Sequence, residues 1–204
     1  MTKSPKRRLW TDAALPGGYE PLVRRAVSGD EAAMERLLMR AQEVAFRFSL
    51  LVCGHAEDAE DVMQEALLKT YRYVGRLKRP EAFRTWLFRI VQNACIVKRR
   101  RRVDEPARIT SLDEGVAGVD GEPTPIDVRD EAKGPDELAI NAWLGRRLRR
   151  ALAALAPRDR MIVLMREMEG LSTREVASIT GMSEANVKTR LHRARVLLRQ
   201  HLEQ

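Results

Sequence analysis

The residues with the clearest chemical purpose lie near the C-terminal end, between residues 184 and 199. Val187, Leu191 and Leu198 recur there at the spacing of one buried helix face, so the residues between them point outward. The outward-pointing residues are Asn186, Lys188, Thr189, His192 and Arg193, with Arg190 and Arg195 beside them. Amide, ammonium, imidazole and guanidinium groups in one row suit the base edges and phosphates of a DNA major groove. These residues predict a helix that reads DNA.

The residues before this helix carry the signals of a helix-turn-helix, which would hold the reading helix in place. Ser172 and Glu175 have the spacing of a capping box at the start of a first helix. Gly181 stands where the turn requires a left-handed backbone, and Ser183 can cap the second helix. The alternative is an ordinary pair of packed helices with a solvated basic face. The agreement of cap, turn glycine and basic face favours the helix-turn-helix.

A second segment, residues 56–74, predicts a helix with an acidic side in an otherwise basic region. Its core-facing stripe is Ala59, Val62, Met63, Ala66, Leu67, Thr70, Tyr71 and Val74. Its polar side is Asp58, Asp61, Gln64 and Glu65. An acidic face repels DNA, so this side is either solvated or docks on a basic protein surface. The residues taken alone favour the solvated interpretation.

A third segment runs from Pro80 into the arginines at 99–102 and predicts a helix with cations off its apolar stripe. The core-spaced residues are Phe83, Trp86, Leu87, Ile90, Val91 and Ala94, and the others are Arg84, Arg89, Asn93 and Lys98. Such a helix can place cations along a phosphate backbone while Asn93 meets a base. The loop at 77–82 can hold a base pulled from the duplex. The alternatives are core packing for Phe83 and Trp86, and a favourable helix dipole for the arginines.

Charge is arranged in three blocks along the 204 residues, whose net charge is +8. Residues 1–102 carry a net charge of +9, residues 103–137 carry −8 and residues 138–204 carry +7. Basic blocks favour a polyanion as partner. The acidic block does not suit a DNA surface, so we expect it to occupy a positively charged groove on a partner or to stay free.

Helical periodicity runs through both basic blocks, and no segment of useful length has the period of a strand. We therefore divide the chain into a disordered basic tail at 1–18, a helical domain at 19–102, an acidic linker at 103–137 and a second helical domain at 138–204. The linker is rich in glycine and proline and too poor in apolar residues to fold alone. The sequence predicts an all-α fold of two small helical domains joined by a flexible acidic linker.

No arrangement typical of a catalytic site, a phosphate-binding loop or a cofactor site is found in the sequence. His55, His192 and His201 lie in unrelated settings, and Cys53 and Cys95 lack the spacing of a metal site. Two separate cysteines, with no signal peptide and no membrane-spanning run, favour the reducing cytoplasm. We therefore expect a protein that is not an enzyme, with no cofactor, no metal and no membrane insertion.

Two stretches of the first domain resemble region 2 of bacterial sigma factors. They read Asp-Ala-Glu-Asp-Val-Met-Gln-Glu-Ala at 58–66 and Phe-Arg-Thr-Trp-Leu-Phe-Arg-Ile-Val-Gln-Asn-Ala at 83–94. Residues 138–199 resemble region 4, and no third domain lies between the two regions. This organisation is similar to that of the extracytoplasmic-function (ECF) group of the sigma-70 family. The resemblance covers nearly all of the chain except the tail and the interior of the linker.

The resemblance implies two surfaces that bind core RNA polymerase. The first is the acidic face of Asp58, Asp61, Gln64 and Glu65, which would dock on the β′ clamp helices, against the solvated interpretation. The second is the apolar surface around Ile162, Val163 and Met165, which would grip the β flap. The acidic linker resembles those that thread toward the polymerase cleft. Family members are commonly held inactive by an anti-sigma protein on the two domains, so an anti-sigma factor is a candidate partner.

The resemblance also implies two promoter-binding surfaces. The residues implied for the melted minus-ten element are Leu77, Lys78, Arg79, Phe83, Arg84, Trp86, Arg89, Asn93, Lys98 and Arg99. The residues implied for the duplex minus-thirty-five element are Arg174, Asn186, Lys188, Thr189, Arg190, His192 and Arg193. The implied function is that of a factor that binds core polymerase and directs promoter recognition, melting and transcription initiation.

Two other functions remain as alternatives. A stand-alone helix-turn-helix transcriptional regulator would use the same C-terminal domain, but it has no use for the acidic face or for an acidic tether. A helical nucleic-acid enzyme such as a recombinase would require a nucleophile and clustered catalytic groups, which the sequence lacks.

Overall fold

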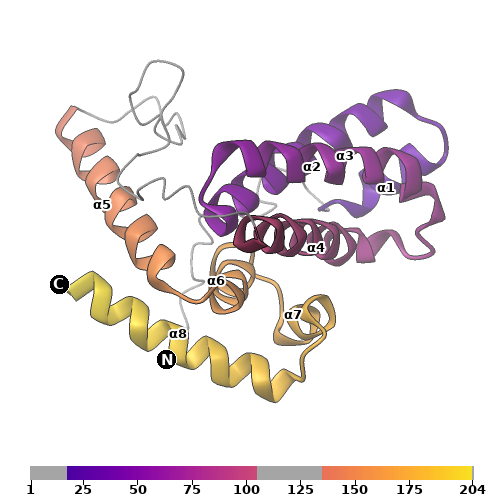
Figure 1. Cartoon of the computed structure of the whole chain (residues 1–204). Helices are drawn as coiled ribbons and strands as arrows, with labels where there is room; N and C mark the ends of the chain where they lie inside the picture. The colour runs from indigo at the N-terminus through magenta and orange to yellow at the C-terminus, as the bar shows by residue number, and fades with distance from the viewer. Residues whose placement is uncertain (1–17, 105–134, 204) are drawn as a thin grey trace, which may run out of the picture.

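The computed structural model describes residues 18–104 and 135–203, and every regular element within them is helical (Figure 1). The first group of elements is α1 (Glu20–Val27), α2 (Glu31–Cys53), α3 (Ala56–Tyr73), the 3-10 turns η1 (Val74–Arg76) and η2 (Pro80–Ala82), and α4 (Phe83–Asp104). The second group is α5 (Pro135–Ala154), α6 (Pro157–Val163), the π-helical turn η3 (Leu164–Met168), α7 (Thr173–Thr180) and α8 (Glu184–Glu203). The predicted all-α fold is confirmed. Most of the expected tail at 1–18 and of the expected linker at 103–137 lies outside the described residues, whose gaps are 1–17 and 105–134. At its two ends the expected linker is helical, because α4 extends to Asp104 and α5 begins at Pro135.

Helices α1 to α4 pack around buried apolar residues that are continuous with those of the second group, and the long helix α2 contacts the other three. The Asp30 carboxylate caps α2 by accepting a hydrogen bond of 2.9 Å from the Ala33 N–H. Gly54, with a φ of 80°, ends α2 in the left-handed conformation. Phe48 of α2 and Phe88 of α4 meet edge to face, with ring centroids 5.2 Å apart. This aromatic contact holds α4 against α2.

The loop expected between α3 and α4 contains the two 3-10 turns η1 and η2. Val74 in η1 is fully buried and anchors the loop to the core. The helix expected from Pro80 begins as a 3-10 turn and becomes α-helical only at Phe83. Arg79 is extended because proline disfavours the helical conformation in the residue before it.

Helices α5 to α8 form the second group, whose core is built mainly by α6 and η3. Residues 157–168 form two successive helical elements, because α6 ends at Val163 and η3 continues as a wider π-helical turn. After the left-handed Gly170, the Leu171 N–H donates to the Met165 carbonyl at 2.9 Å. The chain thereby leaves η3 with its backbone groups paired and turns toward α7.

Helices α7 and α8 form the expected helix-turn-helix, and its local signals are confirmed. The Ser172 hydroxyl accepts from the Glu175 N–H at 3.2 Å, and the Glu175 carboxylate accepts from the Ser172 N–H at 2.7 Å. Gly181 has a φ of 70° in the turn. The Ser183 hydroxyl accepts from the Asn186 N–H at 3.2 Å and caps α8.

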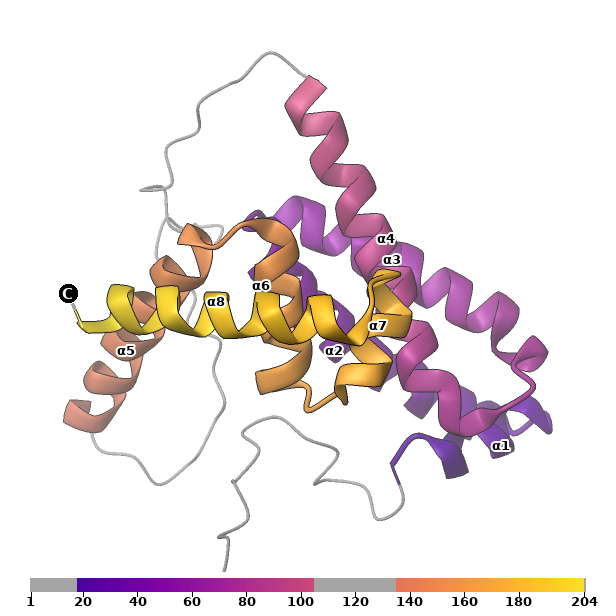
Figure 2. The same ribbon diagram turned by 90° about the horizontal axis from the view of Figure 1, so that it is seen from below.

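The two groups of helices meet along α4. Figures 1 and 2 show α7 beside α4, while α8 runs on the outer side of α6. Helix α6 also contacts α2 near its C-terminal end. Helix α4 of the first group therefore packs against α7, the first helix of the helix-turn-helix.

We expect the Glu175→Gln variant to lower the free energy of unfolding at neutral pH and to lose this difference from wild type in acid. Burial opposes ionisation of Glu175, but hydrogen bonds from Ser172 and the charge of Arg84 hold its pKa below the ordinary value. Stabilisation by the carboxylate is therefore complete above the unfolded pKa of about 4.3 and disappears as the pH falls through the lower native pKa. Urea unfolding at several pH values measures this difference.

The matched variant is Ser172→Ala, which removes the other half of the capping box. It should cost about 1 kcal/mol of unfolding free energy at neutral pH. A Glu175→Gln deficit that stayed constant from neutral pH to acid would contradict the role assigned to the ionised carboxylate.

Candidate nucleic-acid interface

The outward face expected for α8 is present in the structure. Its exposed residues are Asn186, Lys188, Thr189, His192 and Arg193, and Arg174 is exposed on α7. Val187, Leu191 and Ala194 are buried on the opposite side. Burial of one side of α8 therefore presents cations and hydrogen-bonding groups together to solvent, as a duplex-reading helix requires.

Arg190 differs from the expectation, because it is half-buried and tied to its own domain. Its Nη1 lies 2.7 Å from Asp159 Oδ1 of α6, and its Nε donates to Asn186 Oδ1 at 3.2 Å. Arg190 thus fixes α8 against α6 and holds the Asn186 amide, rather than standing free for DNA. Arg195, which the sequence placed beside the reading face, donates to Glu167 at 3.0 Å.

The acidic face of α3 is exposed at Asp61, Gln64 and Glu65. Asp58 does not belong to this face, because only 9% of the residue is exposed. Asp58 lies one helical turn before the buried Val62 and so faces the end of α2 instead of solvent. The expected docking face is therefore reduced to three residues.

The acidic face and the basic helix α4 are joined by an ion pair. Lys98 Nζ of α4 donates to Asp61 Oδ2 of α3, and Glu65 pairs with Lys69 within α3 at 2.5 Å. Asp61 and Lys98 were assigned to two different surfaces from the sequence. The structure places them in contact, so the two surfaces share this ion pair.

The residues expected at the minus-ten element divide into exposed and buried sets. The exposed ones are Lys78, Arg79, Arg89, Asn93 and Arg99. Phe83 is fully buried, against the expectation of a DNA contact, because its ring packs on Tyr19 with centroids 5.2 Å apart. Trp86 is half-buried against Phe83, and Leu77 packs partly on the core. Phe83 is therefore a core residue beneath this surface, where its ring packs against Trp86.

Two of the arginines on α4 that were expected to bind DNA instead contact polar groups of the second group of helices. Arg89 Nη2 donates to the Ser178 carbonyl at 3.0 Å and to the Ser178 hydroxyl at 2.9 Å. Arg84 Nη2 lies 3.6 Å from Glu169 Oε2. Thr85 donates to the Glu175 carboxylate at 3.5 Å. Helix α7 therefore covers part of the basic side of α4 in this arrangement.

Arg160 of α6 is a residue that the sequence reasoning missed. It is buried, with 8% exposed, and burial lowers its pKa. Its Nη1 donates to the Val52 carbonyl of α2 at 3.1 Å, and its Nη2 donates to the Ala153 and Leu155 carbonyls at 2.7 and 3.3 Å. One guanidinium thereby ties the ends of α2 and α5 together. The signal available in the sequence was a single arginine directly before an apolar run.

The apolar surface expected around Ile162, Val163 and Met165 does not exist, because all three are buried in the core of the second group. Large apolar side chains are exposed elsewhere in that group. They are Trp143, Leu144 and Leu148 on α5, and Val196 and Leu197 on α8. Helices α5 and α8 are in contact, and Arg147 of α5 donates to the Leu202 carbonyl of α8 at 2.5 Å.

The described residues were also compared with the requirements of a metal site and of a membrane-spanning helix. Within 18–104 and 135–203, no three or more His, Cys, Asp or Glu side chains gather in a way that could hold a metal ion. Among the helices that the structure describes, none has the length and apolar character to cross a membrane.

Comparison with known proteins identifies the family. Sigma-70 region 2 matches residues 34–104, and Sigma-70, region 4 matches residues 145–198. The chain is 37% identical over 187 residues to the ECF RNA polymerase sigma factor SigL of Mycobacterium tuberculosis, covering 87% of this chain and 96% of that protein. The chain belongs to the ECF group of the sigma-70 family.

A second relative of this sigma factor is longer. The chain is 31% identical over 180 residues to the ECF RNA polymerase sigma factor SigE of Mycolicibacterium smegmatis, covering 86% of this chain but 65% of that protein. Residues 34–104 contain nearly all of α2 together with α3 and α4, and residues 145–198 contain part of α5 and reach into α8. The matched regions thus contain both halves of the α4–α7 contact.

Two solved structures share the fold of this chain. The sigma factor RpoE of Bartonella quintana, solved in complex with the anti-sigma factor NepR, gives a TM-score of 0.60 at 20% identity and covers 83% of this chain and 96% of that one. CnrH, solved in complex with the cytosolic domain of CnrY, gives a TM-score of 0.59 at 23% identity, with 91% and 97% covered. These likenesses extend over both helical groups.

We expect the Arg160→Ala variant of the sigma factor to lose about 1–3 kcal/mol of unfolding free energy, because the substitution leaves buried carbonyl acceptors without a donor. Urea unfolding followed by circular dichroism measures the loss. The control is Arg158→Ala, an exposed arginine on the same helix, which should stay close to wild type. Equal stability of the two variants would contradict the structural role of Arg160.

Proposed function

We propose that this ECF sigma factor binds core RNA polymerase, recognises a promoter in two parts and opens the DNA between them. The observation that carries the proposal is the combination of three exposed surfaces on one chain. They are the acidic face of α3, the basic side of α4 and the outward face of α8. A stand-alone regulator would use only the last of them.

Helix α8 supplies the upstream, duplex-reading contact. Lys188 and Arg193 are exposed cations suited to phosphates and guanine edges, and Asn186 is an amide suited to adenine. The hydrogen bond from Arg190 orients the Asn186 side chain before DNA arrives. We therefore assign Arg190 to positioning and the other residues of this face to reading the minus-thirty-five element.

Helix α4 and the loop before it supply the downstream contact with a melted strand. Asn93 is exposed beside Arg89, and Lys78 and Arg79 are exposed in the loop. Cations on both sides of an amide can hold a backbone while the amide meets an unpaired base. Tighter binding of the single-stranded form than of the duplex shifts the equilibrium toward melting, so no catalytic side chain is required.

The acidic face of α3 docks on a basic surface of core polymerase, which we take to be the β′ clamp helices. Asp61 is the central residue of this face and is already paired with Lys98. A cation from polymerase that engages Asp61 would compete with Lys98 for the carboxylate. Docking would then leave Lys98 of α4 available to a phosphate, so core binding and minus-ten capture support each other.

The contact between α4 and α7 has to open before α4 can bind a strand along its whole length, because Arg84 and Arg89 are engaged by Glu169 and Ser178. Core polymerase can hold the two domains at the spacing of the promoter elements. Once one domain is bound, the other then searches at a high effective concentration. The free protein, with α7 on α4, is expected to bind promoters weakly.

Two further protein contacts belong to the proposal. We assign the β flap to the exposed apolar side chains Trp143, Leu144 and Leu148 of α5, in place of the buried residues expected from the sequence. The two solved proteins with this fold are each described in complex with a further protein, which for the sigma factor RpoE is an anti-sigma factor. We propose the same class of partner here.

Core binding is tested with an Asp61→Lys/Gln64→Ala variant in a pull-down with core RNA polymerase. We expect at least about tenfold weaker binding, because the variant brings a like charge to a basic docking surface. The control is Glu35→Lys, which makes the same kind of charge change at an exposed residue of α2. Unaffected binding of the double variant would contradict the docking assignment.

The division of labour between the two DNA surfaces is tested by transcription in vitro on duplex and premelted templates. Asn93→Ala and Lys188→Ala should each lower initiation on duplex promoter about tenfold, the size of one lost polar contact to DNA. A template melted in advance over the minus-ten element should restore most of the Asn93→Ala activity.

The same premelted template should leave Lys188→Ala impaired, because its contact lies in the upstream duplex. Equal rescue of both variants would show that the two helices do not have the separate roles proposed.

A further inference from the structure

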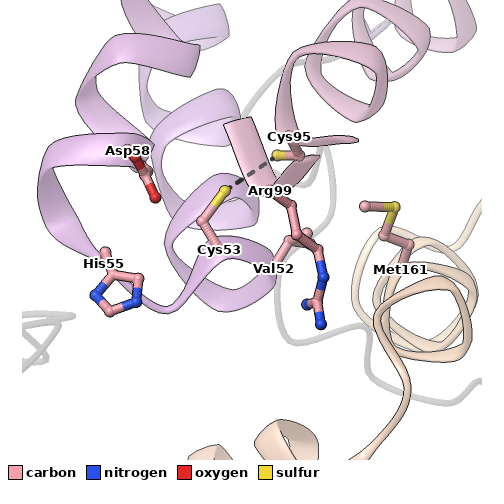
Figure 3. Close-up of a pocket in the computed structure, with 7 residues that line it drawn as sticks. All are labelled: Val52, Cys53, His55, Asp58, Cys95, Arg99 and Met161. Atoms are coloured by element: carbon pink, nitrogen blue, oxygen red, sulfur yellow. Dashed lines mark hydrogen bonds between the residues drawn. The ribbon is translucent and has the colours of Figure 1, made fainter. Parts of the chain in front are cut away.

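Two cysteines that play no part in the proposed promoter function face each other across the first helical group. Cys53 is the last residue of α2, and Cys95 lies on α4, 42 residues later in the chain. Their sulfur atoms are 3.5 Å apart (Figure 3), and both are in the reduced, thiol form. A disulfide bond is about 2 Å long, so an approach of about 1.5 Å would join them.

We propose that Cys53 and Cys95 form a reversible oxidation site, at which an oxidant of the hydroperoxide class links α2 to α4 by an intramolecular disulfide. The chain positions of the two residues support this assignment. Cys53 precedes the glycine that ends α2 and lies at an element terminus, which can move by the required distance more readily than the middle of a helix.

A small oxidant can reach the pair through a cavity of about 240 Å³. The cavity is lined by Val52, Cys53, His55, Asp58, Cys95, Arg99 and Met161 (Figure 3). Cys53 is half-buried, whereas Cys95 is 1% exposed. Cys53 is therefore the thiol that a dissolved oxidant reaches first.

Cys95 is suited to the second step and not to the first. Its hydrogen bond with Cys53 and its burial raise the pKa of the Cys95 thiol above the ordinary value. It also lies 3.9 Å from the Ser49 hydroxyl, within the helix bundle. A protonated, enclosed thiol reacts slowly with a dissolved oxidant, so Cys53 is oxidised first and Cys95 resolves the product.

The chemistry balances with hydrogen peroxide as the oxidant. The Cys53 thiolate attacks one peroxide oxygen, a sulfur–oxygen bond forms, the oxygen–oxygen bond breaks, and the departing hydroxide takes a proton to become water. The Cys95 sulfur then attacks the Cys53 sulfenic acid, the disulfide forms, and hydroxide leaves with the Cys95 proton as a second water. The two thiols are oxidised by two electrons, and the peroxide is reduced by two.

The cross-link would act on the part of the fold where the two domains meet. The carbonyls of Leu51 and Val52, next to Cys53, receive the Arg160 guanidinium of α6. Closing a loop of this length restricts the unfolded chain and raises stability when the bond fits the native geometry. The oxidised protein should therefore resist urea better than the reduced protein.

The test treats the reduced full chain with hydrogen peroxide, blocks the remaining thiols by alkylation in denaturant, and measures intact mass and disulfide-linked peptides. We expect a monomer with one Cys53–Cys95 disulfide and no alkylated thiol, reversed to two alkylated thiols by dithiothreitol. The urea midpoint should rise on oxidation and return on reduction. A fall in the midpoint would show that the cross-link does not fit the native fold and would overturn the proposal.

Single variants separate the two steps. Cys95→Ser should stop at a Cys53 sulfenic acid that dimedone traps, whereas Cys53→Ser should leave the Cys95 thiol unreacted at the same peroxide concentration. Circular dichroism establishes that each variant is folded. Wild-type protein that stays folded but keeps both thiols, forms only disulfide-linked dimers, or carries Cys53 on to sulfinic acid without joining Cys95 would overturn the proposal.

Discussion

Burial of one side of α4 is the constraint on which the rest of this structure depends. Phe88 meets Phe48 edge to face, and Phe83 packs on Tyr19, so the rotation of α4 about its axis is fixed by the core of the first domain. The remaining side of the helix carries arginines and Asn93, which have to find an anion, a hydrogen-bond acceptor or water. DNA phosphates can satisfy these groups, and so can the second domain.

The second domain occupies that side of α4 in the present arrangement. Ser178 and Glu169 supply acceptors to Arg89 and Arg84, and Arg160 closes the contact from the other direction by donating to the end of α2. These contacts combine exposed hydrogen bonds from Arg89, which contribute little each, with the largely buried Arg84–Glu169 pair and the buried Arg160 guanidinium.

The sequence predicted correctly those features that depend on neighbouring residues, such as helix caps. Its predictions were wrong where the exposure of a side chain depends on how helices pack. The capping box of Ser172 and Gly181 in the turn were predictable because each acts within one helical turn. Asp58 was placed on an exposed face although it lies one turn from the buried Val62. Ile162 was expected on a surface, but a short apolar run does not reveal which of its sides a neighbouring helix will cover.

The sequence by itself determined the all-α class and the outward face of α8, because helical periodicity and caps depend on neighbouring residues. The family followed from the resemblance of the segments at 58–66, 83–94 and 138–199 to sigma-factor regions 2 and 4. Only the tertiary structure decided which polar groups are free. Arg190 is held by Asp159, Lys98 by Asp61, and Arg89 by Ser178, and each partner lies 31 to 89 residues away in the chain. Such pairs depend on how whole helices pack, which no local spacing records. The same packing brought two distant cysteines within 3.5 Å of each other.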